Sequence, residues 1–338
     1  MASIRSISEE TKFSVATVSE ALRNTGRVKK ETRDIILAAA DRMGYQRNAL
    51  VGDVMSRIRK SQATDFNGTI GVLETVSFHR NRGYSRWHKE LFDGAKKRSE
   101  ELGYKLEFFQ FKLEQRSLKR LEQILLARGI SAVLLPPYTN PRDLDVIDWD
   151  LFTTVQLDYG LQKMRMHTVL PDHHTSLLKA LAKLEKMGYR RPGLMVERFQ
   201  DERIFMKWLA AYKAFETQSS ECESVPVFEP YDLTKEEFFD WFRRARPDVI
   251  IGHRSDVIGW LDEKGLKVPE DVGFFSLNLH HTPDETAGLN LLPDQLGKAA
   301  IEVLVSSLHR QETGVPEVPH TTSLQALVVD GPTIRQMD

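Results

Sequence analysis

One short segment near the amino end, residues 14–22, carries side chains suited to reading DNA bases. Val18, Ala21 and Leu22 recur at helical spacing and predict a buried face, with Ser14 as the N-cap. The opposite face carries short side chains that allow a helix to approach base edges closely, namely Val15, Ala16, Thr17, Ser19 and Glu20. Val15 and Ala16 offer only apolar contact, which suits a thymine methyl group. Glu20 is an acceptor and suits a cytosine amino group.

Two further helices are expected to hold this segment in place. Ser6 and Glu9 have capping-box spacing and predict a first helix. A third helix is expected over residues 30–43. Its inward stripe is predicted as Ile35, Ile36, Ala39 and Met43. Three short helices, with a tight turn between the first two, describe a helix-turn-helix.

Charge is distributed unevenly along the chain. The 338 residues carry 47 Lys and Arg against 48 Asp and Glu, for a formal net charge of −1. Residues 1–60 hold twelve basic and seven acidic side chains, so this part has a net charge of +5 and the remainder −6. Such asymmetry is typical of a nucleic-acid-binding module joined to a larger body, although a basic solvated surface gives the same count.

The composition and motifs argue against several other classes. The amino end has no apolar h-region and no long uncharged apolar run follows, so neither a signal peptide nor a membrane span is expected. Cys222 is the single cysteine, which excludes an internal disulfide and a Cys-based zinc site and suits a reducing cytoplasm. Phosphate-loop, dinucleotide-binding, zinc-protease and hydrolase motifs are missing.

Two adjacent histidine pairs, His173-His174 and His280-His281, invite a metal hypothesis. Neighbouring side chains on an extended segment point apart, so these residues are interpreted as loop or core histidines. Cys222 has no flanking base and is not expected to be a catalytic thiol. We therefore expect no catalytic residue, cofactor or metal.

From Gly68 onward, short apolar runs alternate with helical stretches. Strands are expected at 69–73, 105–111, 131–135, 193–196, 248–251 and 272–277. Helices are expected at 85–102, 118–128, 174–187, 203–215 and 255–264. This alternation predicts parallel sheets covered on both faces, in two doubly wound α/β lobes. Ligands of such folds bind at the carboxyl ends of the strands, so the cleft between the lobes is the expected site.

The amino-terminal segment resembles the lac/gal repressor family. The matching pieces, in order, are Ser14-Val15-Ala16-Thr17-Val18-Ser19, Gly26-Arg27-Val28, Glu31-Thr32-Arg33, Ala38-Ala39-Ala40, Gly44-Tyr45 and Asn48-Ala49-Leu50. The resemblance continues more thinly through the body and is most distinctive at residues 265–273, GLKVPEDVG.

The resemblance implies three parts. They are an all-α helix-turn-helix domain over 1–47, a hinge over 48–67, and a periplasmic-binding-protein-like effector and dimerisation domain over 68–338. Within the last, an N-lobe is expected over about 68–157 plus 291–320. A C-lobe is expected over about 158–290 plus 321–338.

By this resemblance the second helix lies in the major groove of an operator, with base contacts from Val15 and Ala16. Contacts to the DNA backbone are implied for Ser14, Thr17, Ser19, Asn24, Thr32 and Tyr45. The hinge from Asn48 is implied to order on the operator, with Val54 or Met55 as an apolar wedge between base steps. A plain basic linker is the alternative.

Three positions depart from the family pattern. Glu20 stands where Arg or Lys is usual, Lys29 replaces the usual Ser or Thr cap, and Arg47 replaces the usual Pro. An acid at Glu20 cannot read guanine, and a lysine at the N-cap is unfavourable beside the positive end of the helix dipole. We expect altered specificity or weaker affinity rather than lost DNA binding.

Two ligand chemistries remain open for the cleft. Arg203, Lys207 and Arg254 suit an anionic ligand. A neutral sugar would instead be held by Asn278, Asp256 and Asp158 and would stack on Trp87 or Phe78.

The pattern and the resemblance together predict a cytoplasmic, nucleoid-associated transcriptional regulator. It is expected to be a repressor that binds a pseudo-palindromic operator in double-stranded DNA as a homodimer. A carbohydrate-related small molecule is expected to control it by linkage. The alternative is a soluble solute-binding or enzymatic α/β protein with a vestigial head, which Glu20, Lys29 and Gly52 support best.

Overall fold

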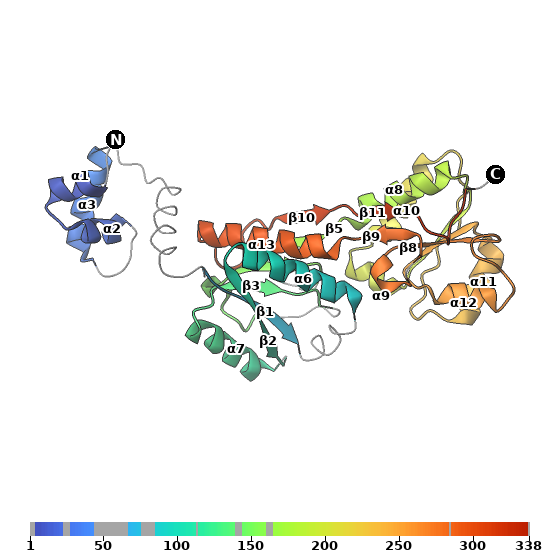
Figure 1. Ribbon diagram of the computed structural model, residues 1–338, viewed down its shortest axis with the longest axis horizontal. Helices are drawn as coiled ribbons and strands as arrows, with labels where there is room; N and C mark the ends of the chain where they lie inside the picture. Colours follow the sequence, from blue (N-terminus) through green and yellow to red (C-terminus); the bar gives the residue numbers. More distant parts are fainter. Residues whose placement is uncertain are drawn as a thin grey trace. The chain divides into compact units, whose positions relative to one another are not determined.

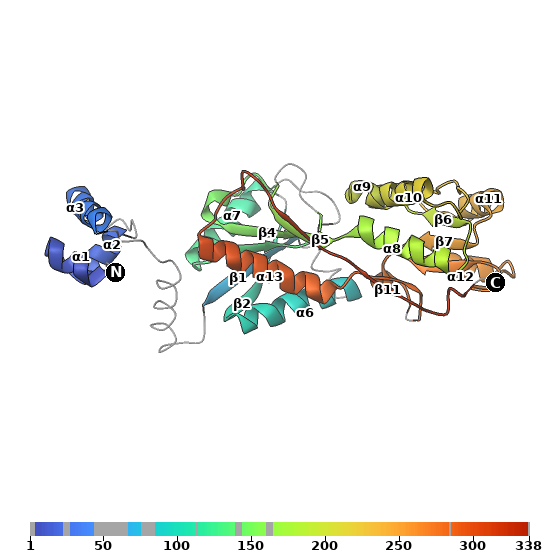
Figure 2. The ribbon, with the colours of Figure 1, turned by 90° about the horizontal axis from the view of Figure 1, so that it is seen from above.

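A computed structural model of the chain describes residues 4–22, 28–43, 67–75, 85–112, 114–138, 144–159, 165–283 and 285–336. The chain divides into two units, a helical head (Met1–Asp65) and an α/β body (Phe66–Asp338), which are drawn in Figures 1 and 2. Within the described part of the chain, no helix is both long enough and apolar enough to cross a membrane.

The described part of the head contains three short helices around a small apolar core. These helices are α1 (Ile4–Thr11), α2 (Val15–Leu22) and α3 (Lys30–Arg42). Their core residues are Ile7, Val18, Ala21, Ile36, Ala39 and Ala40. The hydroxyl of Ser14 accepts a hydrogen bond from the Thr17 backbone N–H at 3.1 Å, so Ser14 caps α2 as predicted. Ser6 lies inside α1 rather than at its N-cap, because α1 already begins at Ile4.

Helix α3 buries a different stripe from the predicted one. Ile36, Ala39 and Ala40 are buried, whereas Ile35 is 53% exposed. Ile36, Ala39 and Ala40 have i, i+3, i+4 spacing and share one face of the helix, and Ile35 lies about 100° from Ile36 at the edge of that face. Ala40, one turn after Ile36, therefore takes the inward place assigned to Ile35. Lys29 is the N-cap of α3 and makes no capping hydrogen bond through its side chain.

The N-lobe of the body is built on a parallel six-stranded sheet with the order β10-β5-β4-β3-β1-β2. Its strands are β1 (Gly68–Thr75), β2 (Tyr104–Phe111), β3 (Ala132–Leu135), β4 (Thr153–Leu157), β5 (His167–Pro171) and β10 (Thr321–Leu324). Helices α6 (Arg86–Glu101) and α13 (Pro293–Arg310) cover one face, and α7 (Gln115–Ala127) covers the other, as Figure 2 shows. A 3-10 turn, η1 (Trp149–Leu151), precedes β4.

The C-lobe has a five-stranded sheet with the order β11-β9-β8-β7-β6. Its strands are β6 (Pro192–Met195), β7 (Val249–Gly252), β8 (Gly273–Ser276), β9 (Gly288–Asn290) and the antiparallel edge strand β11 (Leu327–Val329). Helices α8 (His173–Lys186) and α10 (Lys207–Gln218) pack on one face, and α11 (Lys235–Ala245) and α12 (Asp256–Asp262) on the other. Two short elements, α9 (Arg198–Arg203) and η2 (Leu279–His281), complete this lobe.

The chain passes between the lobes three times: after β5, between β9 and α13, and between β10 and β11. The sequence placed the first and last of these passages before β5 and before β10, at 158 and 321. Both strands instead pair within the N-lobe sheet. Strand β10 reads Thr-Thr-Ser-Leu and lies at an exposed sheet edge, so it has no apolar run by which it could be recognised.

Helices α6 and α13 approach each other unusually closely. A Cβ atom on Gly94 would lie 2.1 Å from the Asp294 carbonyl oxygen, and one on Gly297 would lie 2.0 Å from the Leu91 carbonyl oxygen. Only glycine permits this approach of two backbones. The two helices therefore form one rigid pair on the N-lobe sheet, seen side by side in Figures 1 and 2.

Candidate DNA-binding surface and effector cleft

The amino end of α2 presents small groups to solvent. Val15 is 47% exposed, Ser14 is exposed, and the Ser14 and Thr17 hydroxyl oxygens lie 2.8 Å apart. Val18 and Ala21 on the opposite side are buried against α1 and α3. The helix is thus held by its apolar face while methyl and hydroxyl groups remain available at its start, which is the arrangement a recognition helix needs.

The remaining predicted DNA contacts differ in how much the structure says of them. Thr32 is partly exposed on α3, and Glu20 is half-buried on α2. The side chains of Ala16 and Ser19 are not among those described. Asn24, Tyr45, Asn48, Val54 and Met55 lie outside the described residues. Contact of any of these residues with DNA stays a prediction.

The carboxyl ends of strands from both sheets meet where the lobes join. Asp158 follows β4 of the N-lobe, while Glu197, His253 and Asn278 follow β6, β7 and β8 of the C-lobe. Backbone polar groups at these ends have no further strand to pair with, so the loops that begin there can present side chains to a ligand. We call this junction, with Asp158, Glu197, His253 and Asn278 at its strand ends, the effector cleft.

An ion pair joins the two sides of the cleft. Arg203 Nη1 lies 3.4 Å from Asp158 Oδ2, and Asp158 has a left-handed backbone with φ of +54°. Such a conformation is uncommon outside glycine and persists when surrounding structure enforces it. The second carboxylate oxygen, Oδ1, and the hydroxyl of the next residue, Tyr159, are buried without a hydrogen-bond partner among the described residues. Burial, reinforced by Asp158, raises the pKa of Tyr159, so its hydroxyl stays protonated.

Three rings pack against one another beside this ion pair. The ring of His173, the first residue of α8, lies 5.3 Å from the Trp208 ring, which is stacked at 5.8 Å and 14° on His253. Neither nitrogen of His173, nor Trp208 Nε1, nor His253 Nδ1 has a hydrogen-bond partner in the part of the chain that the structure describes. Burial lowers the pKa of His173 to about 4, and the cations Arg203 and Lys207 add to the effect while Asp158 opposes it. The imidazole is therefore neutral at pH 7 and offers one donor and one acceptor.

Charged groups at the outer side of the cleft are already matched with one another. Glu197 Oε2 lies 2.9 Å from His253 Nε2, and Glu197 Oε1 lies 3.3 Å from Arg254 Nη1. Arg254 also donates from Nε to Asp256 at 2.8 Å. The hydrogen bond from His253, with further help from Arg254, lowers the pKa of Glu197 despite its burial. These groups line a cavity of about 350 Å³ together with Phe199, Gln200, Asp232, Ser255 and His281.

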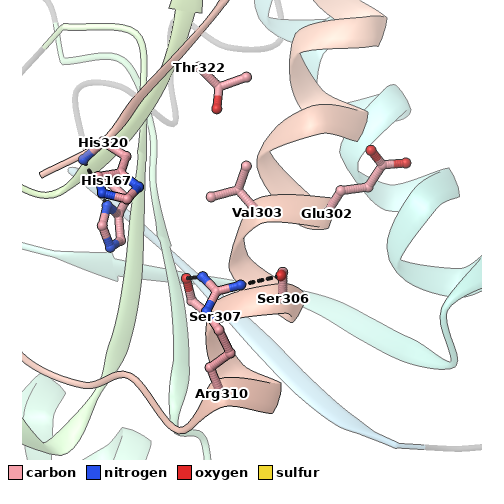
Figure 3. Close-up of a pocket in the computed structure, with 8 residues that line it drawn as sticks. All are labelled: His167, Glu302, Val303, Ser306, Ser307, Arg310, His320 and Thr322. Atoms are coloured by element: carbon pink, nitrogen blue, oxygen red, sulfur yellow. Dashed lines mark hydrogen bonds between the residues drawn. The ribbon is translucent and has the colours of Figure 1, made fainter. Parts of the chain in front are cut away.

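A second cavity, of about 340 Å³, lies in the N-lobe between α13 and the strands β5 and β10 (Figure 3). Several of its polar groups already have hydrogen-bond partners. Arg310 donates to Ser306, Ser307 and Glu312, and His167 Nδ1 accepts from the His320 backbone N–H at 2.9 Å. A ligand gains little from groups whose hydrogen bonds are already made. The effector cleft, with its unbonded buried atoms, is therefore the better candidate.

The structure brings together some of the predicted effector residues. Asp158 pairs with Arg203, Arg254 pairs with Asp256, and Lys207 lies close enough to His173 to depress its pKa. Trp87 and Asn278 are buried and both contact His280. Phe78 lies outside the described residues. Contact of these residues with an effector remains predicted from the sequence.

Sequence reasoning missed several groups of the cleft, chiefly Trp208, Tyr159, Glu197 and His253. Trp208 directly follows Lys207, which was singled out, but an aromatic residue at helical spacing ordinarily indicates core. His173 is buried, as the interpretation of a loop or core histidine allows, and its ring lies beside Trp208. Among the described residues, no group of three His, Cys, Asp or Glu side chains is placed to hold a metal ion.

A helix-turn-helix head joined to a two-lobed body defines a DNA-binding transcriptional regulator. Two curated relatives are regulators. The chain is 25% identical over 215 residues to the HTH-type transcriptional regulator AscG of Escherichia coli K12, covering 63% of this chain and 60% of that protein. It is 22% identical over 351 aligned positions to the HTH-type transcriptional repressor PurR of Haemophilus influenzae Rd, covering 97% and 98%.

Solved structures share the fold over the whole length. The transcriptional regulator CelR in complex with cellobiose superposes with a TM-score of 0.61 at 16% identity, over 98% of this chain and 100% of that one. The lac repressor dimer bound to operator and an anti-inducer gives 0.56 at 15%, over 98% of each chain. Residues 3–48 match the family model described as bacterial regulatory proteins, lacI family. The family match thus covers the head of this chain.

Proposed function

We propose that this chain is a cytoplasmic transcriptional repressor, without enzymatic activity, whose operator binding is controlled by a neutral carbohydrate in the effector cleft. Two copies would bind the two halves of a pseudo-palindromic operator through α2. The regulatory step is linkage: a ligand that binds one arrangement of the two lobes better than the other shifts the population of that arrangement.

The observation that carries the ligand class is the set of buried polar atoms without partners. It combines an acceptor on Asp158, a donor on Trp208, and groups on Tyr159, His173 and His253 that include both kinds. Leaving such groups unpaired costs about 1–3 kcal/mol each, so a partner is expected. Hydroxyl groups both donate and accept and can satisfy this mixture, while the Trp208 ring offers an apolar face for a sugar ring.

The charges of the cleft favour a neutral ligand over an anion. Arg203 faces Asp158, and Arg254 faces Glu197 and Asp256, so an added anion would first have to displace a carboxylate. Lys207 has no such partner among the described side chains and is the one exception in this cluster. The complex of the structural neighbour CelR with cellobiose supports the same choice.

The DNA-binding part of the proposal rests on α2. Its apolar face is buried in the head and its amino end exposes Val15 and Ser14. The dimeric lac repressor on its operator, which has the same fold, supports a dimer on a two-part site.

Two measurements test the proposal. Selection of random DNA duplexes by the purified chain at low salt should enrich one palindrome. Fluorescence anisotropy of that labelled duplex should then show that one neutral sugar weakens or strengthens its binding to the chain. A thermal-shift screen of neutral sugars, sugar phosphates and purines should identify that sugar. Val15→Asp should abolish operator binding, whereas Val318→Asp, at a body residue that is 68% exposed, should not.

The outcomes separate the competing hypotheses. Failure to enrich any palindrome, with or without the screened compounds, would refute the regulator and favour the solute-binding or enzymatic alternative. Stabilisation by a sugar phosphate or a purine, but by no neutral sugar, would refute the ligand class while leaving the regulator intact.

A further inference from the structure

Among the described residues, the two lobes also touch at a place separate from the Arg203–Asp158 ion pair. The first turns of α6 in the N-lobe face η2 in the C-lobe. His280 Nε2 lies 3.0 Å from Glu90 Oε2, and the His280 ring meets Trp87 edge-on at 5.6 Å. His280 and Trp87 are both buried. Because these groups are buried or half-buried, water cannot freely replace either partner when the pair breaks, and breaking it costs more than breaking a surface pair.

The His280 ring lies between two oxygen acceptors. Its Nε2 faces the Glu90 carboxylate, and its Nδ1 lies 3.3 Å from Asn278 Oδ1, an oxygen that also accepts from the His280 backbone N–H at 3.0 Å. A neutral imidazole carries a proton on one nitrogen only, so one of these two contacts lacks a proton. The doubly protonated ring satisfies both contacts. Protonation of His280 therefore strengthens the bond between the lobes.

Burial disfavours the protonation of His280, as does Arg86 on α6, whereas Glu90 on α6 and Asp294 on α13 favour it. The adjacent His281 is itself neutral at pH 7, because burial lowers its pKa to about 4. Burial prevails, and the pKa of His280 lies below its ordinary value. At pH 7 the ring is accordingly neutral.

We infer that Glu90 and His280 form a latch between the lobes, and that His280 is a positioning residue which couples the effector cleft to helix α6. His280 follows β8 directly after Asn278, at the strand end that borders the cleft. Glu90 lies on α6, which the close approach at Gly94 and Gly297 makes rigid with α13. A change in the cleft that moves η2 is therefore transmitted to a rigid pair of N-lobe helices.

The coupling to the effector rests on the proposed function, but the latch itself does not. Its test uses the full chain without ligand or DNA. Four forms are compared: wild type, Glu90→Gln, His280→Gln and the double variant. Glu100→Gln is the matched control, because Glu100 is an exposed acid on the same helix. Small-angle scattering gives the radius of gyration, and thermal unfolding gives Tm at pH 7.5 and pH 5.5.

Each latch variant should increase the radius of gyration and lower Tm at pH 7.5. At pH 5.5 the loss in Tm should be larger for Glu90→Gln, because Glu90 favours the protonated His280 ring, and smaller for His280→Gln, because the lowered native pKa of His280 makes the wild type itself less stable in acid. The double variant should lose no more than the more damaging single variant, because both remove one interaction. Additive losses, losses that do not depend on pH, or an unchanged radius of gyration would overturn the latch.

The coupling has a separate readout. In the presence of the sugar found by the thermal-shift screen, Glu90→Gln should change the sugar concentration for half-maximal response by severalfold, whereas Glu100→Gln should leave it unchanged. An unchanged half-maximal concentration in Glu90→Gln, with the latch effects above present, would refute the coupling alone. If no sugar acts on the wild type, the proposed function fails while the scattering result still decides the latch.

Discussion

Trp208 provides the sharpest test of the effector cleft, because one substitution removes its indole N–H and keeps an aromatic ring. Its indole Nε1 is buried without a partner among the described residues, while its ring packs between His173 and His253. Trp208→Phe retains an aromatic ring and deletes the donor. If a ligand hydroxyl accepts from Nε1, the variant loses a hydrogen bond worth about 1 kcal/mol, which weakens binding about fivefold.

The size of the expected effect can be followed in a thermal-shift assay. At a ligand concentration of about 100 times the wild-type Kd, binding stabilises the native state by about 2.7 kcal/mol. A fivefold weaker variant at the same concentration gains about 1.8 kcal/mol. For a body of this size each kcal/mol moves Tm by about 2–4 °C, so the ligand-induced shift should shrink by about 2–3 °C. Titration calorimetry gives the same change directly as Kd.

Trp260→Phe serves as the control for this experiment. Trp260 packs on Phe238 in the apolar cluster on the other face of the C-lobe sheet. Its replacement changes the same atoms but should leave Kd unaltered. Equal Kd values for wild type and Trp208→Phe, or equal effects of Trp208→Phe and Trp260→Phe, would remove Trp208 from the site and with it the assignment of the unpartnered atoms to a ligand.

Three further outcomes are expected. Glu20→Arg should raise non-specific DNA affinity and steepen the slope of log K against log salt by about 0.9 per added phosphate contact, and an unchanged slope would show that Glu20 faces away from DNA. Gly297→Ala, whose Cβ would lie 2.0 Å from a carbonyl oxygen, should lower the free energy of unfolding in urea by about 1–3 kcal/mol, whereas Gly259→Ala on α12, with open space, should raise it by up to about 1 kcal/mol. His173 has a native pKa of about 4 against about 6.5 unfolded, so the unfolded chain takes up a proton that the native state resists. Stability should therefore be full above about pH 6.5 and fall by up to about 3 kcal/mol toward pH 4, and His173→Gln should flatten this dependence in urea unfolding.

The sequence predicted best what depends on local pattern. The N-cap Ser14 and the inward Val18 and Ala21 follow from residue types a few positions apart, and all three are where the spacing places them. Strand β10 escaped prediction because a polar edge strand owes its conformation to its neighbour β5, not to its own residues. Ile35 failed because an apolar residue need not be buried when the helix face is already filled.

The candidate cleft shows the same limit at the level of single atoms. Arg203 and Asp158 stand 45 positions apart, and their pairing depends on how α9 and the end of β4 meet. The unpartnered state of Trp208 Nε1 or of the His173 nitrogens has no counterpart in a pattern of residue types. Trp208 is a largely apolar aromatic residue and packs as a core residue does. Only the three-dimensional arrangement distinguishes a buried donor that has no hydrogen-bond partner within the protein from one that has a partner.

The distribution of charge along the chain suggests why, in the proposed mechanism, the ligand acts by changing the spacing of the two heads. The first 60 residues carry +5 and the rest of the chain −6, so attraction to DNA comes from the head alone. In the cleft, Arg203 and Arg254 are matched by carboxylates, and a neutral ligand leaves this balance unchanged. The ligand therefore cannot alter the electrostatic attraction of either part and must act on the spacing of the two heads. With a modest charge on each head, joint engagement of both half-sites supplies most of the operator affinity. The Glu90–His280 contact would transmit a small change in the orientation of the two lobes. Such a change is enough to release the operator when it moves one head away from its half-site.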